Sequence, residues 1–440
     1  MAVSILEGMS GGTVGFFGLG RSNLALMRMM SDRSKIILRS DQKIRQDDIP
    51  RDVKIAEIFD GDDAAKHINE DFLVFSPSVR RDRSEFSNAA RRGCVFTSDF
   101  DIFLAGNEKP LFLVTGSDGK TTTTTLISLI LGIPAIGNIG EPMTPHLFDG
   151  ADAFAVEASS FMLEYGAPKS RRGAITSLSE NHLNWHHNLA DYKRAKLRAI
   201  EGAEEAVITA DSPLLTVEDL PKKVFAVCGA DGGELVLSRR LSAELCYSVK
   251  NGYILKNGRR IIDTSDLLRN EKYNLKNYLT ALAMTEGFVA EDRAIEVIRS
   301  FGGVAHRGER LGQINGIEFI NSSIDTTPAR CAATLEDLPE GIIILLGGRD
   351  KGLDFTSLGE IIKRRGDRAI AFGEAEEKIA SAIEGCLKAG GGLREAVTFA
   401  AKIARDKDTV LLSPAATSFD EFSGFEERGE AFKSLVFQVF

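Results

Sequence analysis

The chain has 440 residues, of which 43% are hydrophobic and 27% charged, and its formal net charge is −9. This length exceeds what one ordinary hydrophobic core covers, so we expect several domains. The acidic balance argues against nucleic acid as the main partner, because nucleic-acid-binding proteins favour a basic surface. No apolar run reaches the roughly eighteen residues that a membrane span needs, so we expect no membrane insertion.

Two further features favour a cytoplasmic protein. Residues 1–12 lack the charged segment and the long apolar core of a signal peptide. The five cysteines are scattered without metal-binding or paired spacing, which suits a reducing compartment.

Apolar strand-like runs alternate with amphipathic stretches almost throughout, which favours α/β domains with parallel sheets. The first such unit is an apolar run at residues 14–17, a glycine-containing turn and a helix at residues 24–30. The turn is similar to a dinucleotide-binding turn, but Asn23 stands where the third glycine belongs. Both a ligand-binding turn and a tight turn without a ligand remain open. Further strands are expected at residues 73–76 and 94–97.

The most informative segment joins an apolar run at residues 111–113 to an apolar helix at residues 126–131. Glycines between them would let the backbone approach an anion, and the new helix would point its N–H groups at it. Lys120 would neutralise the outer phosphates, and Thr121 would offer its hydroxyl to Mg²⁺. Val114 replaces the first glycine of the full Walker pattern. The strand and helix on either side nevertheless favour a nucleotide-binding loop, formed by Gly116, Ser117, Asp118, Gly119, Lys120, Thr121 and Thr122.

Candidate metal ligands follow the neighbouring strands. Glu157 ends the apolar strand at residues 153–157, and parallel strands deliver their carboxyl ends to one crevice. We favour a cation-binding role for this carboxylate over a capping or salt-bridging role. His182 and His186 have the spacing of a zinc pair, but no His-Glu-x-x-His motif or nearby thiol accompanies them. We therefore favour His182 as a ligand of a second divalent cation, and His186 as a packing or surface residue.

Three domains are predicted, at residues 1–106, 107–303 and 304–440. The central domain should contain strands at residues 173–177, 206–209 and 224–227, an antiparallel insertion at 235–248 and 253–262, and a helix at 277–288. The last domain should contain strands at residues 317–320, 342–346, 369–372 and 410–412. The charged runs at residues 80–83 and 363–368 are interpreted as solvated faces. Lys196, taken alone, is typical of an exposed helix lysine.

Taken together, these residues resemble the Mur ligases. The matching motifs occur in family order along almost the whole chain: Thr115-Gly-Ser-Asp-Gly-Lys-Thr-Thr122, Gly137-Asn-Ile-Gly140, Glu157-Ala-Ser-Ser-Phe161, Glu180-Asn-His182, Tyr192-Lys-Arg-Ala-Lys-Leu-Arg198, Asn274-Leu-Lys-Asn277, His306-Arg307, Leu346-Gly-Gly-Arg-Asp-Lys351 and Leu412-Ser-Pro-Ala-Ala-Thr-Ser-Phe419. The resemblance implies a Rossmann-like N-terminal domain, a central P-loop domain that binds mononucleotides, and a Rossmann-like C-terminal domain. We expect a monomer.

The short first domain and the Leu-Ser-Pro-Ala segment favour the family members that add D-glutamate to UDP-N-acetylmuramoyl-L-alanine in peptidoglycan synthesis. In these enzymes ATP phosphorylates the substrate carboxylate, and the amine of D-glutamate attacks the acyl phosphate. The resemblance implies ATP and two Mg²⁺ sites, with Thr121, Glu157 and His182 as metal ligands. It also implies that Lys120, His182 and Lys196 are catalytic, with Lys196 carbamylated.

The resemblance further assigns binding residues to each substrate. Asn277, Arg307 and Asp325 would contact the nucleotide. The UDP-linked substrate would be bound by Gly18, Gly20, Arg21, Ser22, Asn138 and Ser159. D-Glutamate would be bound by Thr326, Lys351, Ser418, Phe419 and Phe425.

One motif departs from the family. Where the family usually has Asn-Asp-Ser-Lys-Ala-Thr, this chain has Asn321-Ser-Ser-Ile-Asp-Thr-Thr327. Ser322 replaces an acidic nucleotide contact and Ile324 replaces a lysine, whereas Asp325 adds a carboxylate one position further on, which could substitute for the lost one. These changes leave open a sibling or folylpolyglutamate-type ligase with another amino acid, and a nucleotide-binding paralogue without ligase activity. The intact Lys120, Glu157, His182 and Lys196 argue against the paralogue.

Overall fold

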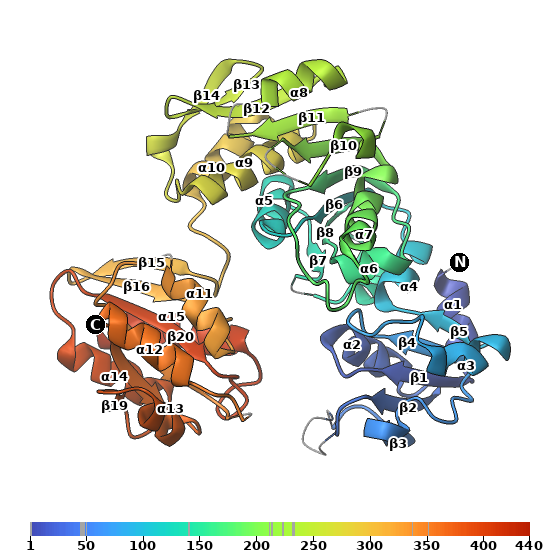
Figure 1. The fold of residues 1–440 in the computed structure, drawn as a ribbon, viewed down its shortest axis with the longest axis horizontal. Helices are drawn as coiled ribbons and strands as arrows, with labels where there is room; N and C mark the ends of the chain where they lie inside the picture. Colours follow the sequence, from blue (N-terminus) through green and yellow to red (C-terminus); the bar gives the residue numbers. More distant parts are fainter. Residues whose placement is uncertain are drawn as a thin grey trace. The chain divides into compact units, whose positions relative to one another are not determined.

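The computed structural model describes residues 2–44, 49, 51–139, 141–210, 212, 214–221, 224–230, 234–336, 338–350 and 352–440. The chain forms two compact units, Met1–Phe301 and Gly302–Phe440. The first unit contains two sheets and the second contains one, all built mainly from parallel strands (Figure 1). The predicted α/β class is therefore confirmed.

The first sheet is entirely parallel, in the order β3-β2-β1-β4-β5. Its strands are β1 Thr13–Phe17, β2 Lys35–Ser40, β3 Glu57–Asp60, β4 Phe72–Phe75 and β5 Val95–Thr97. The accompanying helices are α1 Ala2–Met9, α2 Arg21–Met30, α3 Ser87–Arg91 and α4 Asp99–Gly106. Helix α2 buries Leu26, Met27 and Met30 against the sheet, because positions three and four apart share one helix face.

Asn23 closes the turn between β1 and α2. Its Nδ2 donates to the carbonyl oxygens of Gly18 at 2.8 Å, Phe17 at 3.2 Å and Val74 at 3.4 Å. The buried asparagine thus bonds the turn to two neighbouring strands, where a dinucleotide-binding turn would have glycine.

The second sheet has nine strands in the order β14-β13-β12-β11-β10-β9-β6-β8-β7. They are β6 Leu111–Thr115, β7 Ala135–Gly137, β8 Phe154–Glu157, β9 Ser170–Ile175, β10 Ala203–Thr209, β11 Val224–Gly229, β12 Leu245–Lys250, β13 Tyr253–Lys256 and β14 Arg259–Asp263. The helices are α5 Lys120–Leu131, α6 Ser160–Tyr165, α7 Leu189–Glu201, α8 Glu234–Leu241, α9 Lys272–Thr285 and α10 Glu291–Ser300, with a 3-10 helix, η4, at Thr144–Phe148. Helices α5, α9 and α10 lie on one face of the sheet, and α6 and α7 on the other (Figure 1).

The predicted antiparallel insertion is partly wrong. Residues 234–241 form helix α8, and β12 pairs in parallel with β11. Leu237 and Leu241, one helical turn apart, pack against the core formed with Val227, which explains why this stretch is a helix. The antiparallel pairs of this region are β12 with β13 and β13 with β14. The turn at Asn251 and Gly252 has the positive φ angles, 51° and 77°, that a tight hairpin needs.

The sheet of the second unit has the order β15-β16-β20-β17-β18-β19, with only β15 antiparallel to its neighbour. Its strands are β15 Glu309–Ile314, β16 Ile317–Asn321, β17 Ile343–Gly347, β18 Arg368–Phe372, β19 Leu387–Lys388 and β20 Thr409–Ala415. Alternate residues of the buried strand β17 face two cores. One core contains residues from α11 Pro328–Glu336, α12 Thr356–Arg365 and α13 Glu376–Ala382, and the other contains residues from α14 Leu393–Ile403 and α15 Phe425–Val439.

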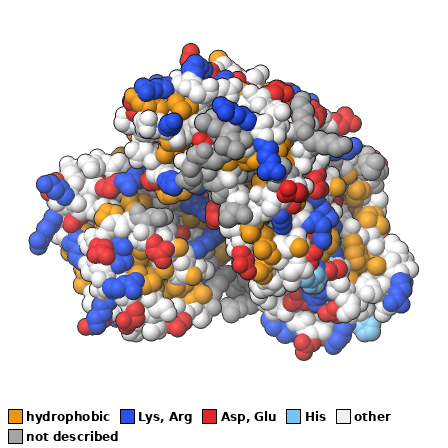
Figure 2. Space-filling model, turned by 45° about the horizontal axis from the view of Figure 1, so that its top comes forward, with side chains coloured by type: hydrophobic (Ala, Val, Ile, Leu, Met, Phe, Trp, Pro, Cys, Tyr) orange, Lys and Arg blue, Asp and Glu red, His pale blue; other side chains and the backbone are white. Residues whose placement is uncertain are grey.

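On the face drawn in Figure 2, acidic and basic side chains are interspersed. Within the part of the chain that the structure describes, no helix is long and apolar enough to cross a membrane.

Candidate active site

The loop between β6 and α5 forms a tight cradle. Gly116 and Gly119 have φ angles of 157° and 79°. A Cβ atom at Gly116 would overlap the hydroxyl oxygen of Thr176, and one at Gly119 would overlap the amide oxygen of Asn277. Glycine is therefore required at both positions by close approach, and at Gly119 also by the left-handed backbone. Helix α5 begins directly after this loop, so its first N–H groups point toward the cradle.

Polar bonds hold the loop in this shape. The Ser117 hydroxyl lies 2.9 Å from the carbonyl oxygen of Ser179 and 2.8 Å from the Tyr192 hydroxyl. The backbone N–H of Asp118 donates to the Ser177 hydroxyl at 2.8 Å. The loop is thus fixed by the segment that follows β9 and by helix α7. Lys120 Nζ donates to the carbonyl oxygens of Gly116 and Ser117, at 3.0 and 2.8 Å.

A carboxylate with two polar neighbours lies beside the start of α5. Glu157, at the carboxyl end of β8, is 1% exposed. Its Oε2 accepts a hydrogen bond from the Thr121 hydroxyl at 2.9 Å, and its Oε1 accepts one from Asn138 Nδ2 at 2.6 Å. The structure therefore brings together three residues that were predicted separately. A carboxylate and a hydroxyl are oxygen donors of the kind that hard divalent cations prefer.

Lys196 is buried beneath the loop, which contradicts its interpretation as an exposed helix lysine. It is 2% exposed, and Nζ donates to the Gly116 carbonyl oxygen at 2.6 Å and to the Thr115 hydroxyl at 3.4 Å. The ammonium group lies 5.0 Å from the centre of the Tyr192 ring. Burial, followed by the positive charge of Lys120, holds the pKa of Lys196 well below its ordinary value. The side-chain nitrogens of Lys120, from α5, and Lys196, from α7, thus both bond to the carbonyl oxygen of Gly116.

His182 has a backbone conformation that costs free energy. Its φ of 54° is left-handed, which costs a residue other than glycine about 1–3 kcal/mol. Its N–H donates to the Asn181 side-chain oxygen at 2.8 Å, and its ring lies 5.0 Å from that of Phe161. Burial, and then the charges of Lys196 and Lys120, lower the pKa of His182. These effects favour the neutral imidazole, the form that can bind a metal.

The other two histidines of this segment differ in exposure. His186 is buried, and its Nε2 lies 3.0 Å from the Ser160 hydroxyl, whereas the His187 side chain is 69% exposed. Burial lowers the pKa of His186 to about 4. Among the described residues, no group of three or more His, Cys, Asp or Glu side chains could hold a metal ion. The zinc-pair alternative gains no support.

A cavity of about 370 Å³ lies between the first two sheets. Five of the six residues predicted to bind the UDP-linked substrate line it: Gly18, Gly20, Arg21, Ser22 and Asn138. The sixth, Ser159, caps helix α6 by accepting the N–H of Met162, which lines the cavity together with Phe161. The cavity thus joins the turn after β1 to the loop after β7. Because α2 begins at this turn, its N-terminal N–H groups favour an anionic ligand.

Asp99 at the wall of this cavity was not predicted from the sequence. It is buried, and its carboxylate accepts the backbone N–H groups of Met143 and Thr144, each at 2.8 Å. Burial raises the pKa of this carboxyl group. No local pattern marks such a contact, because the partners are more than forty positions apart in sequence.

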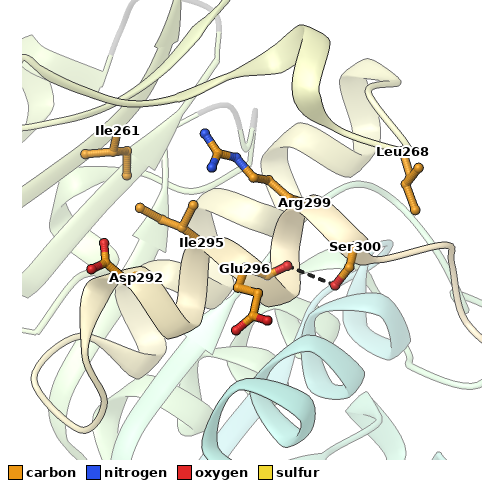
Figure 3. Close-up of a pocket in the computed structure, with 7 residues that line it drawn as sticks. All are labelled: Ile261, Leu268, Asp292, Ile295, Glu296, Arg299 and Ser300. Atoms are coloured by element: carbon orange, nitrogen blue, oxygen red, sulfur yellow. Dashed lines mark hydrogen bonds between the residues drawn. The ribbon is translucent and has the colours of Figure 1, made fainter.

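A second, shallow pocket of about 630 Å³ lies elsewhere on the first unit (Figure 3). Most of its wall comes from α10, with Ile261 of β14 and Leu268 completing it. None of the predicted site residues lines it.

The second unit holds the other predicted site residues on loops and helix starts. Arg307 is exposed and Thr326 is half-buried, whereas Ser418 is buried in the loop after β20. Phe419 is 49% exposed, and Phe425 begins α15. Lys351 lies outside the described residues.

Asp325 is 4% exposed and is held inside the second unit. Its Oδ2 accepts hydrogen bonds from the hydroxyls of Ser413 and Thr334, both at 2.8 Å. Burial raises the pKa of this carboxyl group. In this structure the carboxylate binds hydroxyls of β20 and α11, and its role as a nucleotide contact stays a prediction.

Arg428 is a second residue that was not predicted from the sequence. It is 1% exposed, and its guanidinium donates to Ser323, to the carbonyl oxygen of Gly347 and to that of Ala416. These acceptors follow or end three adjacent strands, β16, β17 and β20. One buried arginine of α15 thus fixes the strand ends near which several predicted amino-acid-binding residues lie.

Comparison with known proteins gives the family. Residues 114–285 match the model of the Mur ligase middle domain, and residues 306–416 match that of the Mur ligase, glutamate ligase domain. The chain is also similar to the crystal structure of a UDP-N-acetylmuramate-alanine ligase from Thermotoga maritima. The TM-score is 0.53 and the identity 16%, over 96% of this chain and 98% of that one, which supports the fold.

Curated relatives match this chain over almost its whole length. The UDP-N-acetylmuramoylalanine--D-glutamate ligase of Ruminiclostridium cellulolyticum is 31% identical over 96% of each chain, and that of Pelotomaculum thermopropionicum is 31% identical over the same shares. The enzyme of the same name from Aquifex aeolicus is 30% identical, over 96% of this chain and 97% of its own. With these relatives and both domain models agreeing, the chain belongs to the Mur ligase family.

Proposed function

We propose that this protein joins D-glutamate to UDP-N-acetylmuramoyl-L-alanine, with ATP activating the carboxylate of the muramoyl substrate. As a Mur ligase the protein is an ATP-dependent ligase of peptidoglycan synthesis. The observation that carries the assignment of the site is the convergence of Lys120 and Lys196 on the Gly116 carbonyl, beside the carboxylate of Glu157. We assign the substrate from the relatives, whose names specify D-glutamate.

The three predicted domains would divide the binding tasks. Residues 1–106 would bind the UDP portion, and 107–303 would bind ATP through the loop after β6. Residues 304–440 would bind the amino acid. Two separate sheets within the first unit, and a cavity lined from both, support the division of that unit into two domains.

Mg²⁺ would fit the donor set beside α5. Thr121 and Glu157 offer a hydroxyl and a buried carboxylate that already face each other at 2.9 Å. His182, with its lowered pKa, offers a neutral imidazole for a second ion. When bound, the ions would offset the negative charge of the phosphoryl groups.

The lowered pKa of Lys196 supports its proposed carbamylation. A neutral amine can add to carbon dioxide, forming an N–C bond and releasing one proton to solvent. The resulting carbamate is an anion, and it would place a negative charge beside Lys120. Carbamylation would thus convert a neutral neighbour of Lys120 and of the cations into one that attracts them.

The chain's own groups account for the transfer of the phosphoryl group. The N–H groups at the start of α5 would bind the terminal phosphates, and Lys120 would stabilise charge on the group that moves. The amine of D-glutamate would then attack the acyl phosphate, an amide bond would form, and phosphate would leave. Asn277, which adjoins the loop at Gly119 and accepts from the Thr123 hydroxyl, would contact the adenine base.

The second unit would bind the remaining partners. Arg307 would contact the nucleotide, and Thr326, Lys351, Ser418, Phe419 and Phe425 would surround the amino acid. A cation and hydroxyls suit the two carboxylates of D-glutamate. Each of the five cysteines is a free thiol, which fits the cytoplasmic location that we propose.

Amino-acid specificity tests this proposal. ADP release would be measured with ATP, Mg²⁺ and UDP-N-acetylmuramoyl-L-alanine while D-glutamate, L-glutamate, L-alanine, glycine and diaminopimelate are supplied in turn. We expect stimulation by D-glutamate. Stimulation by another amino acid, but not by D-glutamate, would contradict the assignment.

A further inference from the structure

We propose that Trp185, the only tryptophan of the chain, is a positioning residue that couples the filling of the cavity to the position of His182. This inference rests on the proposed function, since it takes the cavity as the site of the UDP-linked substrate and His182 as part of the reaction centre.

On one side, Trp185 is anchored to the loop that follows β4. Its Nε1 donates to the carbonyl oxygen of Ser78 at 2.7 Å. The guanidinium of Arg80 lies 4.9 Å from the ring centre and donates to the carbonyl oxygen of Trp185. Arg80, which the sequence predicted to lie on a solvated face, has a side chain only 19% exposed. Charge–ring contact and hydrogen bonds together fix the indole against the first sheet's loops.

On the other side, Trp185 packs against α6. Its ring lies 4.5 Å from the ring of Phe161 and 6.3 Å from that of Tyr165. Phe161 also contacts the His182 ring, at 5.0 Å. Both Ser78 and Phe161 line the cavity. Two of the groups that hold the indole are therefore walls of the cavity, so a ligand that fills it contacts supports of Trp185 directly.

Trp185 is linked to His182 through the backbone. The N–H groups of Trp185 and His186 both donate to the carbonyl oxygen of His182, each at 3.0 Å. His182 begins this turn in a left-handed conformation, which a residue other than glycine adopts rarely. Because the turn is anchored through Trp185, a displacement of the indole is transmitted to the backbone that carries the imidazole.

The fluorescence of Trp185 in the wild-type protein tests whether filling the cavity changes the surroundings of the indole. Since the chain has one tryptophan, its emission comes from Trp185 alone. Titration of the full-length protein with UDP-N-acetylmuramoyl-L-alanine should change the intensity or wavelength of emission and reach saturation. An emission that stays constant at concentrations that saturate turnover would overturn the proposal.

Kinetics of Trp185→Phe separate positioning from packing. Phenylalanine keeps the contacts with Phe161 and Arg80 but loses the bond to Ser78. We expect kcat to fall at least tenfold and the KM for the UDP-linked substrate to rise several-fold, with the KM for ATP unchanged. Arg293→Met, which removes an arginine with a 54% exposed side chain on α10, serves as the control and should behave as wild type. Thermal unfolding of each variant checks its folding.

Two results of this comparison would count against the coupling. An unchanged kcat would overturn it, whether or not KM rises, because Trp185 would then be a wall of the cavity alone. A fall in kcat that appears equally in Arg293→Met would also overturn it. If Trp185→Phe does not fold, the titration of the wild-type protein decides. Absence of product from the wild-type protein would instead contradict the proposed function, while the titration would still report binding in the cavity.

Discussion

Lys196 shows how strongly its surroundings change the chemistry of one side chain. In the sequence it lies among charged residues of an amphipathic helix, yet it is 2% exposed and bonded to the phosphate loop. Its burial next to Lys120 favours the neutral amine, which is the form that reacts with carbon dioxide. The proposed carbamylation of Lys196 depends on this burial, because an exposed lysine keeps its positive charge.

Replacement of Lys196 by alanine should therefore remove a charged group from the reaction centre. We expect kcat to fall by about 100-fold or more, as for other groups that stabilise a developing charge. Short carboxylates such as acetate should restore part of the activity by occupying the space of the carbamate. Arg194→Ala, at a residue of the same helix with a 56% exposed side chain, is the matched control. Unchanged turnover of Lys196→Ala would exclude the carbamate role.

Asp325 allows a test through the pH dependence of stability. Burial raises its pKa in the folded protein above the ordinary value of 3.8. The folded state therefore favours the protonated carboxyl, and its stabilising effect is lost as the pH rises through the folded pKa. Asparagine at this position keeps an oxygen that can accept from Ser413 or Thr334 but cannot ionise.

Asp325→Asn should therefore gain stability relative to wild type as the pH rises from 3 to 7. Urea unfolding at several pH values measures the difference in unfolding free energy between the variant and the wild type. A difference that is independent of pH would contradict a raised pKa of Asp325 in the folded protein. The same variant tests the predicted nucleotide contact, because a lost contact would raise the KM for ATP.

At the scale of elements, the turn between β1 and α2 depends on Asn23. Three backbone carbonyl groups share its side-chain amide. Asn23→Ala would leave buried carbonyl groups without this donor, and we expect a loss of about 1–3 kcal/mol in the free energy of unfolding. Since Gly18, Gly20 and Ser22 line the cavity, the KM for the UDP-linked substrate should rise. Chemical denaturation measures the loss of stability, and steady-state kinetics measure the KM. An unchanged KM would show that the turn held by Asn23 does not contribute to binding of the UDP-linked substrate.

The loop before α5 is equally sensitive at Gly119. A methyl group there would overlap Asn277 and force a left-handed backbone on alanine. Gly119→Ala should raise the KM for ATP at least tenfold and leave binding of the UDP-linked substrate unaltered, because the cavity lies on other loops. Gly132→Ala, at the left-handed C-terminal cap of the same helix with open space around it, controls for backbone strain alone. Equal effects of both substitutions would mean that the overlap with Asn277 is unimportant.

For the whole molecule, the features that depend on neighbouring residues could be predicted from the sequence. The features that depend on contacts between distant residues could not. The strand, loop and helix at residues 111–131 follow from adjacent residues, as does the left-handed turn at Asn251 and Gly252. The helix at residues 234–241 was mistaken for a strand, since its short apolar pattern fits both.

The surroundings of individual side chains were harder to predict. Arg80 was assigned to solvent, but it contacts Trp185, which is 105 positions away along the chain. The burial of Lys196 depends on Gly116, 80 positions away. Such contacts depend on the order of strands in the sheet, which composition and periodicity do not encode.

The proposed reaction needs groups from both compact units. The predicted phosphate-binding residues lie in the first unit and the described residues predicted to bind the amino acid lie in the second. Binding and product formation therefore test different parts of the chain. A protein whose first unit alone is functional would bind the UDP-linked substrate but form no amide.

Product identification tests the central claim most directly. The full-length protein would be incubated with ATP, Mg²⁺, UDP-N-acetylmuramoyl-L-alanine and D-glutamate, and the products separated and weighed by mass spectrometry. We predict a UDP-linked product heavier by one glutamyl residue, formed with D-glutamate and dependent on ATP. Hydrolysis of ATP without this product, or an adduct formed only with a different amino acid, would contradict the account.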